Sequence, residues 1–189
     1  AACAISDYDT DGDLDVFITY KTGSNRLMRN DIDNENNWIQ FDLEGVQSNR
    51  DAVGARIIAV SDTIVQIREV QTGTGYWSQH SLVQHIGLRH REVLDEVIIR
   101  WPSGIRQRYR DLPAGHRYDV VECVECECDA DLDLDFEVDV LDLLVIIDQW
   151  GDCEDCEADF NRDGAIDILD LLVVIDQWGD CPEPEALTP

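Results

Sequence analysis

Apolar and polar residues alternate in short runs along the first two thirds of the chain, which predicts β-strands. In Trp38-Ile-Gln-Phe-Asp-Leu43, the residues Ile39, Phe41 and Leu43 fall on one face. Six similar runs follow, at residues 54–60, 64–70, 82–88, 96–101, 105–110 and 117–122. Turn residues such as Pro102-Ser-Gly104 separate the runs. Short strands at this spacing predict a β-sandwich or barrel-like domain over residues 31–122.

The first 30 residues predict a strand, an acidic loop and two further strands. Val16-Phe-Ile-Thr-Tyr20 is rich in the β-branched and aromatic residues that favour strands. Asn25–Asn30 predicts a short third strand. The loop carries carboxylates at every second position and a glycine, at Asp7, Asp9, Asp11, Gly12 and Asp15.

The last third of the chain is a tandem repeat with a period of 28 residues, in which residues 130–153 return as residues 158–181. Each copy begins with closely spaced carboxylates and continues with apolar residues at helical spacing. The spacing predicts two helices with one buried face each. The faces are Val140, Leu143, Leu144, Ile147 and Trp150 in the first copy and Ile168, Leu171, Leu172, Ile175 and Trp178 in the second. Residues 123–128 form a Cys-rich linker, and disorder is predicted for residues 182–189.

The charge of the chain is concentrated in this last third. The net charge is −27, and residues 119–189 hold 24 acids against a single base, Arg162. So acidic a surface excludes nucleic acids and anionic membranes as partners. No stretch reaches the roughly 18 apolar residues of a membrane-spanning helix. Carboxylates crowded as in the repeat repel one another unless a cation lies among them, so the repeat predicts a paired calcium-binding module with Ca²⁺ as its cofactor.

Seven cysteines indicate an oxidising compartment, and hence a secreted or cell-surface protein. Four of them follow the repeat, which brackets each copy with one pair. We expect these pairs to form disulfides, Cys128 with Cys153 and Cys156 with Cys181, and each to stabilise its copy by roughly 3 kcal/mol. An alternative zinc site lacks a fourth ligand; its three residues are Cys123, Cys126 and Cys128.

The second acidic loop has the spacing of an EF-hand calcium loop. Its predicted ligands are Asp159, Asn161, Asp163, the backbone carbonyl of Ala165, Asp167 and Asp170. Position 12 is Asp170 instead of the usual Glu, and the helix that should enter the loop is replaced by Cys156-Glu157. With these two departures and the duplication, residues 129–181 resemble a type I dockerin, a small calcium module that docks onto a cohesin.

The first loop repeats the pattern with one difference. Its predicted ligands are Asp131, Asp133, Asp135, Glu137, Asp139 and Asp142. Phe136 occupies the glycine position, where a positive φ disfavours a bulky residue. This copy is expected to bind calcium more weakly or to follow another path.

The dockerin resemblance implies a partner surface on the helices just after the loops. The matching residues are Val140, Leu141, Ile168 and Leu169, all apolar. The near-identical halves imply that a cohesin-like partner binds in either of two orientations. The alternative is that these residues only close the core between the helices.

The acidic loop of the first 30 residues resembles the calcium loop of an FG-GAP/VCBS repeat, an element of a β-propeller blade. One such element cannot close a propeller, so further blades and a secretion signal are expected upstream of Ala1. Asp7, Asp9, Asp11 and Asp15 are its predicted ligands. The alternative is a solvated acidic turn.

The middle segment resembles the ASPIC/UnbV domain, which typically follows FG-GAP repeats in extracellular proteins. The residues that carry this resemblance include Asn37-Trp38, Ser48-Asn-Arg-Asp51, Gly73-Thr-Gly-Tyr76, His85-Ile-Gly-Leu88 and Arg100-Trp-Pro-Ser-Gly104. The chain is therefore expected to be a multidomain, mainly β protein with a propeller-type fragment over residues 1–30, a sandwich or barrel-like domain over 31–122 and a small all-α, EF-hand-like module over 129–181.

Three functions remain open. The first is a non-catalytic, calcium-binding scaffold or adhesion fragment, tethered by its dockerin-like module to a cohesin-type partner and in contact with a polysaccharide or matrix. The second is a component of a polysaccharide-degrading assembly whose catalytic or sugar-binding part lies upstream. The third and least favoured is an enzyme in residues 31–122. Its candidate residues are the histidines His80, His85, His90 and His116, with Ser78 and Ser81 near His80. No nucleophile-elbow glycines surround either serine.

Overall fold

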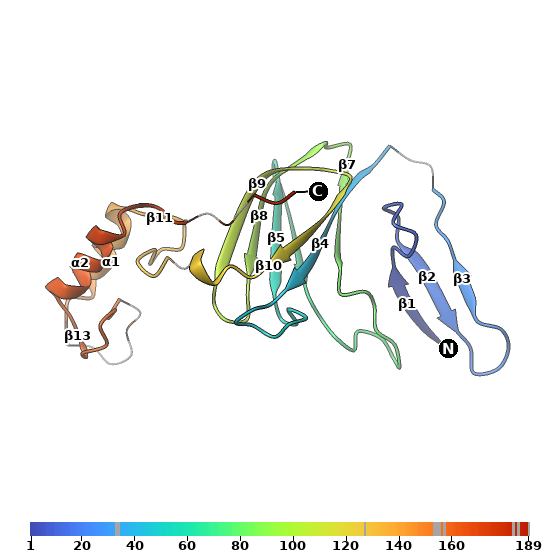
Figure 1. Cartoon of the computed structure of the whole chain (residues 1–189), viewed down its shortest axis with the longest axis horizontal. Coiled ribbons are helices and arrows are strands. Elements are labelled where there is room, and N and C mark those ends of the chain that lie inside the picture. The colour runs from blue at the N-terminus through green and yellow to red at the C-terminus, as the bar shows by residue number, and fades with distance from the viewer. Residues whose placement is uncertain are drawn as a thin grey trace. The chain divides into compact units, whose positions relative to one another are not determined.

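The structure is a computed structural model that describes residues 1–32, 35–126, 128–152, 156, 158–182, 184 and 186–188. It is mainly β, and it contains two short α-helices in the described residues (Figure 1). The chain divides into two compact units. The first unit is Ala1–Val124 with Pro184–Pro189, and the second is Glu125–Glu183.

The N-terminal part of the first unit is a three-stranded antiparallel sheet, as its sequence predicts. Its strands are β1 (Ala2–Ser6), β2 (Asp15–Thr19) and β3 (Arg26–Met28), in the order β1-β2-β3. The acidic loop joins β1 to β2, which pair directly from Ala2↔Thr19 to Ser6↔Asp15. The pairing therefore holds both ends of the loop together.

The rest of the first unit has two sheets that share one core (Figure 1). One sheet is antiparallel with the order β6-β5-β8-β9, from β5 (Arg56–Ser61), β6 (Ile64–Glu69), β8 (Val93–Arg100) and β9 (Arg106–Pro113). The other has the order β10-β4-β7, from β4 (Asn37–Glu44), β7 (Gln84–Arg89) and β10 (His116–Val121), with β10 parallel to β4. All seven strands predicted by alternation are confirmed, within a few residues at their ends.

Alternating side chains from both sheets fill the core. In β4, Ile39 and Phe41 are completely buried, as the sequence predicts. Tyr118 of β10 packs its ring against Phe41, with ring centroids 6.1 Å apart. Leu187, from the tail for which the sequence predicts disorder, lies half-buried against the same core.

The second unit consists of the two repeat copies, and each copy pairs with the other. A short 3-10 helix η1 (Val124–Cys126) leads into it. Its elements are β11 (Glu137–Val138), α1 (Val140–Asp148), β12 (Gly151–Asp152), β13 (Ala165–Ile166), α2 (Ile168–Asp176) and β14 (Gly179–Asp180). β11 pairs with β14 and β12 with β13, both antiparallel. The strand that ends each loop thus pairs with the segment that follows the helix of the other copy.

Because the two copies pair with each other in this way, the predicted disulfide pairs are wrong. Cys128 bonds to Cys181, with Cα atoms 5.6 Å apart, and not to Cys153. Cys181 consequently does not bond to Cys156, which is disulfide-bonded elsewhere, while Cys153 lies outside the described residues. The reason is the β11–β14 ladder, which brings the end of the second copy beside the start of the first. Closing a loop of 53 residues stabilises the unit by about 4 kcal/mol.

The alternative zinc site is also wrong. Cys123, Cys126 and Cys128 are all disulfide-bonded, and a disulfide sulfur is not the thiolate ligand that zinc requires.

The predicted buried faces of the helices are wrong as well. In α1 the buried residues are Asp142 and Ile146, with Leu143 half-buried. The other members of the predicted stripe are about half exposed, namely Val140, Leu144, Ile147 and Trp150. The buried carboxylate explains the difference, because Asp142 must turn inward to hold the loop and Ile146 follows it one turn later on the same side. The helix α2 repeats this with Asp170 and Val174.

Candidate calcium sites and an exposed apolar surface

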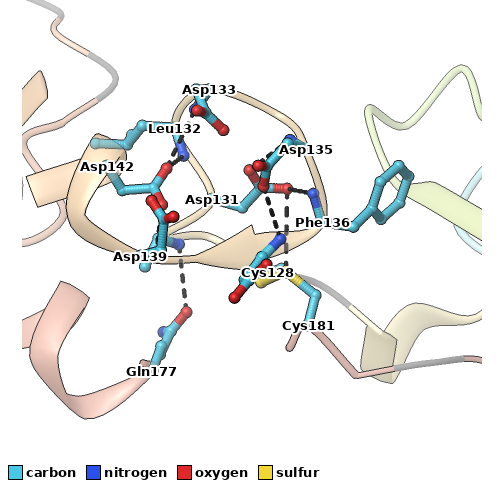
Figure 2. Close-up of a disulfide and its surroundings, with 12 residues drawn as sticks. Cys128, Asp131, Leu132, Asp133, Asp135, Phe136, Asp139, Asp142, Gln177 and Cys181 are labelled. Atoms are coloured by element: carbon cyan, nitrogen blue, oxygen red, sulfur yellow. Dashed lines mark hydrogen bonds between the residues drawn. A yellow bond between two sulfur atoms is a disulfide. The ribbon is translucent and has the colours of Figure 1, made fainter. Parts of the chain in front are cut away.

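Two carboxylates fold the first loop of the second unit into a ring (Figure 2). Asp131 accepts hydrogen bonds from the backbone N–H of Asp135 at 3.0 Å and of Phe136 at 2.9 Å. From the other end of the loop, the completely buried Asp142 accepts from Leu132 N–H at 2.6 Å and Asp139 N–H at 2.8 Å. The first and last acids of the pattern therefore lie together although eleven positions separate them.

The carboxylates of this loop converge on one point. Oxygen atoms of Asp131, Asp133 and Asp142 lie within 4.8 Å of one another. Burial raises the pKa of Asp133, and the charges of Asp135, Asp142 and Asp131 raise it further. Negative oxygens at this spacing are the ligands that calcium prefers. The residues present fit a divalent cation, which would offset their repulsion.

The second loop reproduces these contacts. Asp159 accepts from Asp163 N–H at 3.2 Å and Gly164 N–H at 2.9 Å. Asp170, also completely buried, accepts from Phe160 N–H and Asp167 N–H, both at 2.9 Å. Asn161 and Ala165 stand where the first loop has Asp133 and Glu137, so this loop has four acids where the first has six.

Some predicted ligands have a second structural role. Asp139 and Asp167 are the N-caps of α1 and α2, and each accepts a hydrogen bond from the backbone N–H two residues later. Asp135 accepts a hydrogen bond from the N–H of Glu137. Glu137 is the first residue of β11, as Ala165 is the first residue of β13 in the second copy. The predicted residues of each loop therefore act as turn and cap residues as well as candidate ligands.

Phe136 does not send the first loop along another path. Its φ of 72° matches the 88° of Gly164. Two positions earlier, Leu134 and Arg162 also share a positive φ, of 66° and 57°. A non-glycine residue in this region is strained by on the order of 1 kcal/mol or more, so the first loop carries a strain that the second avoids. The weaker binding of calcium by the first loop stays a prediction.

We expect calorimetric titration of calcium to resolve a weaker site in the first loop and a tighter one in the second. The titration uses the Asp9→Ala variant, which disables the candidate loop of the first unit. Phe136→Gly should bring the two affinities closer, because glycine adopts φ 72° without strain. Phe136→Leu keeps the Cβ and should leave the difference intact. Two equal sites in the Asp9→Ala protein would contradict the strain argument.

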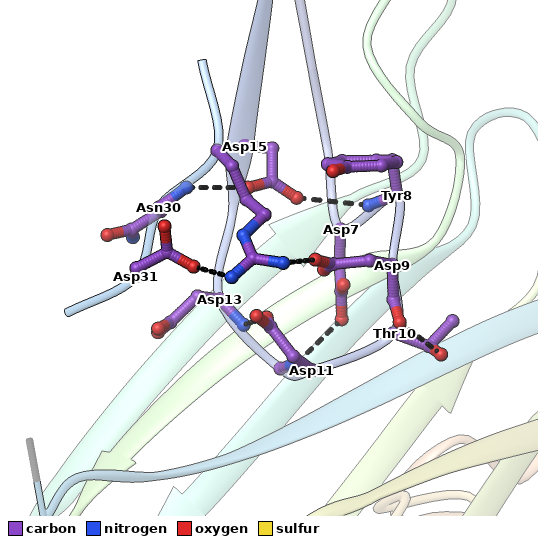
Figure 3. A network of polar contacts seen from close by, with 11 residues as sticks. Asp7, Tyr8, Asp9, Thr10, Asp11, Asp13, Asp15, Asn30 and Asp31 are labelled. Atoms are coloured by element: carbon purple, nitrogen blue, oxygen red, sulfur yellow. Dashed lines mark hydrogen bonds and ion pairs between the residues drawn. The ribbon is translucent and has the colours of Figure 1, made fainter. Parts of the chain in front are cut away.

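The loop between β1 and β2 has the same local conformation as the two loops of the second unit (Figure 3). Asp7 accepts from Gly12 N–H at 3.0 Å, and Asp11 accepts from Asp13 N–H at 2.9 Å. Thr10 and Gly12 take the two positive φ values, 61° and 96°. The resemblance to a calcium loop therefore extends to its backbone conformation.

Two carboxylate oxygens of this loop have no hydrogen-bond partner in the part of the chain that the structure describes. Oxygen atoms of Asp7, Asp9 and Asp15 lie within 4.8 Å of one another. Oδ1 of Asp7 and Oδ1 of Asp9 are both buried without a partner. Burial raises the pKa of Asp9, as do Asp11 and Asp15, while Arg29 at 3.4 Å lowers it. Buried carboxylate oxygens without donors are costly, so this geometry also fits a bound cation.

No sequence pattern indicates the contacts that hold this loop against the β-domain. Gln40 of β4, only 5% exposed, donates from Nε2 to Asp7 Oδ2 at 2.8 Å. Gly12 lies against the indole of Trp38, where a Cβ would come within 1.8 Å of Nε1. Glycine is thus required there both for its φ and for the close approach.

Two of the histidines named as catalytic candidates make structural contacts in the first unit. His80 Nδ1 accepts from Ile5 N–H at 3.2 Å, and His85 stacks on Trp38. Burial lowers the pKa of His85. Ser81 Oγ accepts from Val83 N–H at 3.2 Å.

The two helices of the second unit leave an apolar face exposed on each copy. The first-copy face is Val140, Leu141, Leu144, Ile147 and Trp150, each 48–52% exposed. The second-copy face is Ile168, Leu169, Leu172, Ile175 and Trp178, each 50–61% exposed. Each face begins directly after its loop, since the N-cap aspartate precedes its first residue. The predicted partner residues lie on these faces and not in the core between the helices.

Residues 45–125 match the family model described as ASPIC and UnbV. This segment holds β5 to β10 and agrees with the predicted ASPIC/UnbV resemblance of the middle segment. The resemblances of residues 1–30 and 129–181 stay predictions.

No curated protein matches the chain. Among solved structures, two interface mutants of a type II Cohesin-X-Dockerin complex from Acetivibrio cellulolyticus are similar to it. Each has 13% sequence identity and a TM-score of 0.30, with 76% of this chain and 96% of that chain covered. A TM-score this low carries no conclusion about this chain.

No helix among the described residues has the length and apolarity needed to cross a membrane.

Proposed function

We propose that this chain is an extracellular, non-catalytic scaffold or adhesion fragment whose second unit tethers it, in a calcium-dependent manner, to a cohesin-type protein domain. The first unit, with its ASPIC/UnbV segment, is the part that the tether positions. The disulfide-bonded cysteines support an oxidising compartment.

The observation that carries this proposal is the pair of matching apolar faces. A unit of this size does not leave ten large apolar side chains half exposed in two equal sets without a partner that covers them. The faces share the repeat, so they offer a partner the same surface twice. Their acidic surroundings exclude nucleic acid, which needs a basic surface.

Calcium is part of this proposal because the acidic loops determine how the two apolar faces are oriented. Asp142 and Asp170 join the end of each loop to the first turn of its helix, and both are completely buried. A cation held by the loop would fix the helix rotation that turns the apolar face outward. Without the cation the clustered acids repel, and the faces lose their fixed positions.

The experiment is a binding measurement of the full chain against purified type I cohesin domains, with calcium and with chelator. We expect binding in calcium only. Leu141→Asp or Leu169→Asp alone should weaken binding by about twofold, because the other face still docks. The double variant should abolish binding. Val65→Asp, a change at an exposed residue of β6 in the first unit, is the matched control and should leave binding unchanged.

Absence of binding to every cohesin domain tested would overturn the assignment of the partner. Binding that survives in the double variant would show that the two apolar faces are not the contact surface.

A further inference from the structure

Two aromatic rings form an exposed platform at the tip of a turn between β6 and β7. Tyr76 is 80% exposed and Trp77 is 87% exposed, the highest values among the large apolar residues described. Their rings stack with centroids 5.6 Å apart and planes inclined by 16°. The pair presents two nearly parallel aromatic surfaces to the outside of the first unit.

The base of this tip is fixed by several contacts. Gly75 and Ser78 exchange backbone hydrogen bonds at 3.1 and 3.4 Å and so close the two-residue turn. Below it, His80 N–H donates to Thr74 Oγ1 at 3.3 Å. Strand β1 holds the following segment, because Ser81 N–H donates to Ile5 O at 3.0 Å. The rings are thus mounted on an anchored turn.

The turn is strained at Trp77, and no contact among the described residues compensates the strain. Trp77 has a φ of 60° at the second position of the turn, where glycine or asparagine is favoured. Strain at a bulky residue persists where packing or function maintains it. Packing does not maintain it here, since almost the whole side chain is exposed. A tryptophan at a turn position that favours glycine therefore indicates that the Trp77 side chain contacts a ligand or another molecule.

The surroundings of the tip indicate the chemistry of that contact. Residues 70–84 contain no Asp, Glu, Lys or Arg, although 29% of the chain is charged. The segment instead offers uncharged donors and acceptors, at Gln71, Thr72, Thr74, Ser78 and Gln79. Stacked rings bind the C–H faces of pyranose rings, whose hydrogens carry partial positive charge, through the negative ring faces. Hydroxyls and amides beside them suit sugar hydroxyls.

We propose that the Tyr76–Trp77 tip is a binding site for a neutral polysaccharide. This site lies in the first unit and uses none of the residues of the proposed tether, so each can fail without the other. With this site, the first unit would bind a polysaccharide while the second unit binds the cohesin-type domain.

The test is affinity electrophoresis of the full chain in calcium, in gels that contain a neutral polysaccharide: a mixed-linkage β-glucan, a xylan or a galactomannan. Retardation is expected in at least one of them. Trp77→Ala and Tyr76→Ala should each weaken binding by about tenfold or more, because each removes one stacking surface. An exposed aromatic elsewhere serves as the matched control, since Tyr20→Ala should leave retardation unchanged.

A second variant separates the site from the stability of the fold. Trp77→Gly removes the ring and relieves the positive φ, so it should lose binding while the melting temperature stays equal or rises. A fall in melting temperature would mean that Trp77 is a structural residue and would overturn the proposal.

Three further outcomes would also overturn it. One is the absence of retardation in all neutral gels, and another is retardation that persists in the Tyr76→Ala/Trp77→Ala double variant. The third is binding to phosphatidylcholine vesicles that depends on Trp77, which would assign the tip to a lipid surface.

Discussion

The double variant Asp142→Asn/Asp170→Asn is expected to lose the helices of the second unit even in saturating calcium. Each of these carboxylates is completely buried. Asp142 accepts from the backbone N–H groups of Leu132, Asp133 and Asp139, and Asp170 repeats this pattern from the second copy. An asparagine places an NH₂ group against one of these N–H donors, so a buried hydrogen bond becomes a donor–donor contact.

The expected destabilisation is on the order of 2–3 kcal/mol for each substitution, since a buried charged acceptor is lost. The core of the second unit is small, with Ile146 and Val174 as the buried residues of the helices besides the two aspartates. A unit of this size has only a few kcal/mol of stability in reserve. The two losses together should exceed it. Far-ultraviolet circular dichroism, followed with and without calcium, measures the helical signal.

The matched control removes the same charges from the other end of the helices. Asp148 and Asp176 are the exposed last residues of α1 and α2. Asp148→Asn/Asp176→Asn should keep the helical signal in calcium or raise it slightly, because a negative charge at a helix C-terminus opposes the helix dipole. Chelation should lower the signal of this control and of the unsubstituted chain. A spectrum unchanged by chelator would show that the second unit folds without calcium.

The strands and the loop conformations were predictable because local patterns determine them. In β5 every second residue is buried, so alternation alone locates the strand. The spacing Asp-x-Asp-x-Asp-Gly sets the turn of the loop through contacts within five residues, such as Asp7 with Gly12. The resemblance of residues 31–122 to ASPIC/UnbV is likewise carried by local motifs, and the family match at residues 45–125 supports it.

The rotation of the helices was not predictable from their apolar pattern. The segment Val140–Asp148 is apolar at every position except its two aspartates, so two different stripes look equally suited to the core. The choice between them depends on Asp142, whose buried contacts with Leu132 and Asp139 turn the other stripe outward.

Contacts between distant segments were also beyond the sequence patterns. The repeat spacing brackets each copy with cysteines, but the disulfide Cys128–Cys181 follows from the β11–β14 ladder, which joins the two copies. The bond of Gln40 to Asp7 spans 33 residues, and Gln40 looks like an ordinary outward-facing position of an alternating strand.

Glu122→Ala is expected to destabilise the first unit by about 3 kcal/mol or more. Glu122 follows β10 and is only 3% exposed. Its Oε2 accepts from the backbone N–H groups of Val46, Gln47 and Ser48, each at 2.7 Å. Its Oε1 accepts from the hydroxyls of Ser48 at 2.7 Å and Ser103 at 2.6 Å. The substitution leaves five donors without their acceptor and releases two loops from β10.

Thermal unfolding followed by near-ultraviolet circular dichroism measures this effect, because buried Trp101 and Tyr118 report on the first unit. The control is Glu44→Ala, at the exposed end of β4, where the carboxylate lies 3.6 Å from Arg50. An exposed pair of this kind contributes little, so the control should change stability by less than about 0.5 kcal/mol. Equal melting temperatures of Glu122→Ala and the unsubstituted chain would contradict the role of Glu122.

The same carboxylate gives the first unit a defined acid sensitivity. Burial raises the pKa of Glu122, but the hydrogen bonds from Ser103, Ser48 and Val46 outweigh burial and hold it at about 2, below the ordinary 4.5. Because the folded pKa is the lower one, the stabilisation is fully present above pH 4.5 and is lost as the pH falls towards 2.

Glu122→Gln isolates this contribution, since glutamine does not titrate and the serine hydroxyls can rotate to accept from its amide. The stability gap between the unsubstituted chain and Glu122→Gln should narrow by about 3 kcal/mol as the pH falls through this window. Every other acid is common to both proteins, so their titration cancels in the difference. A gap that stays constant with pH would mean that Glu122 titrates normally and that its hydrogen bonds do not favour the charged form.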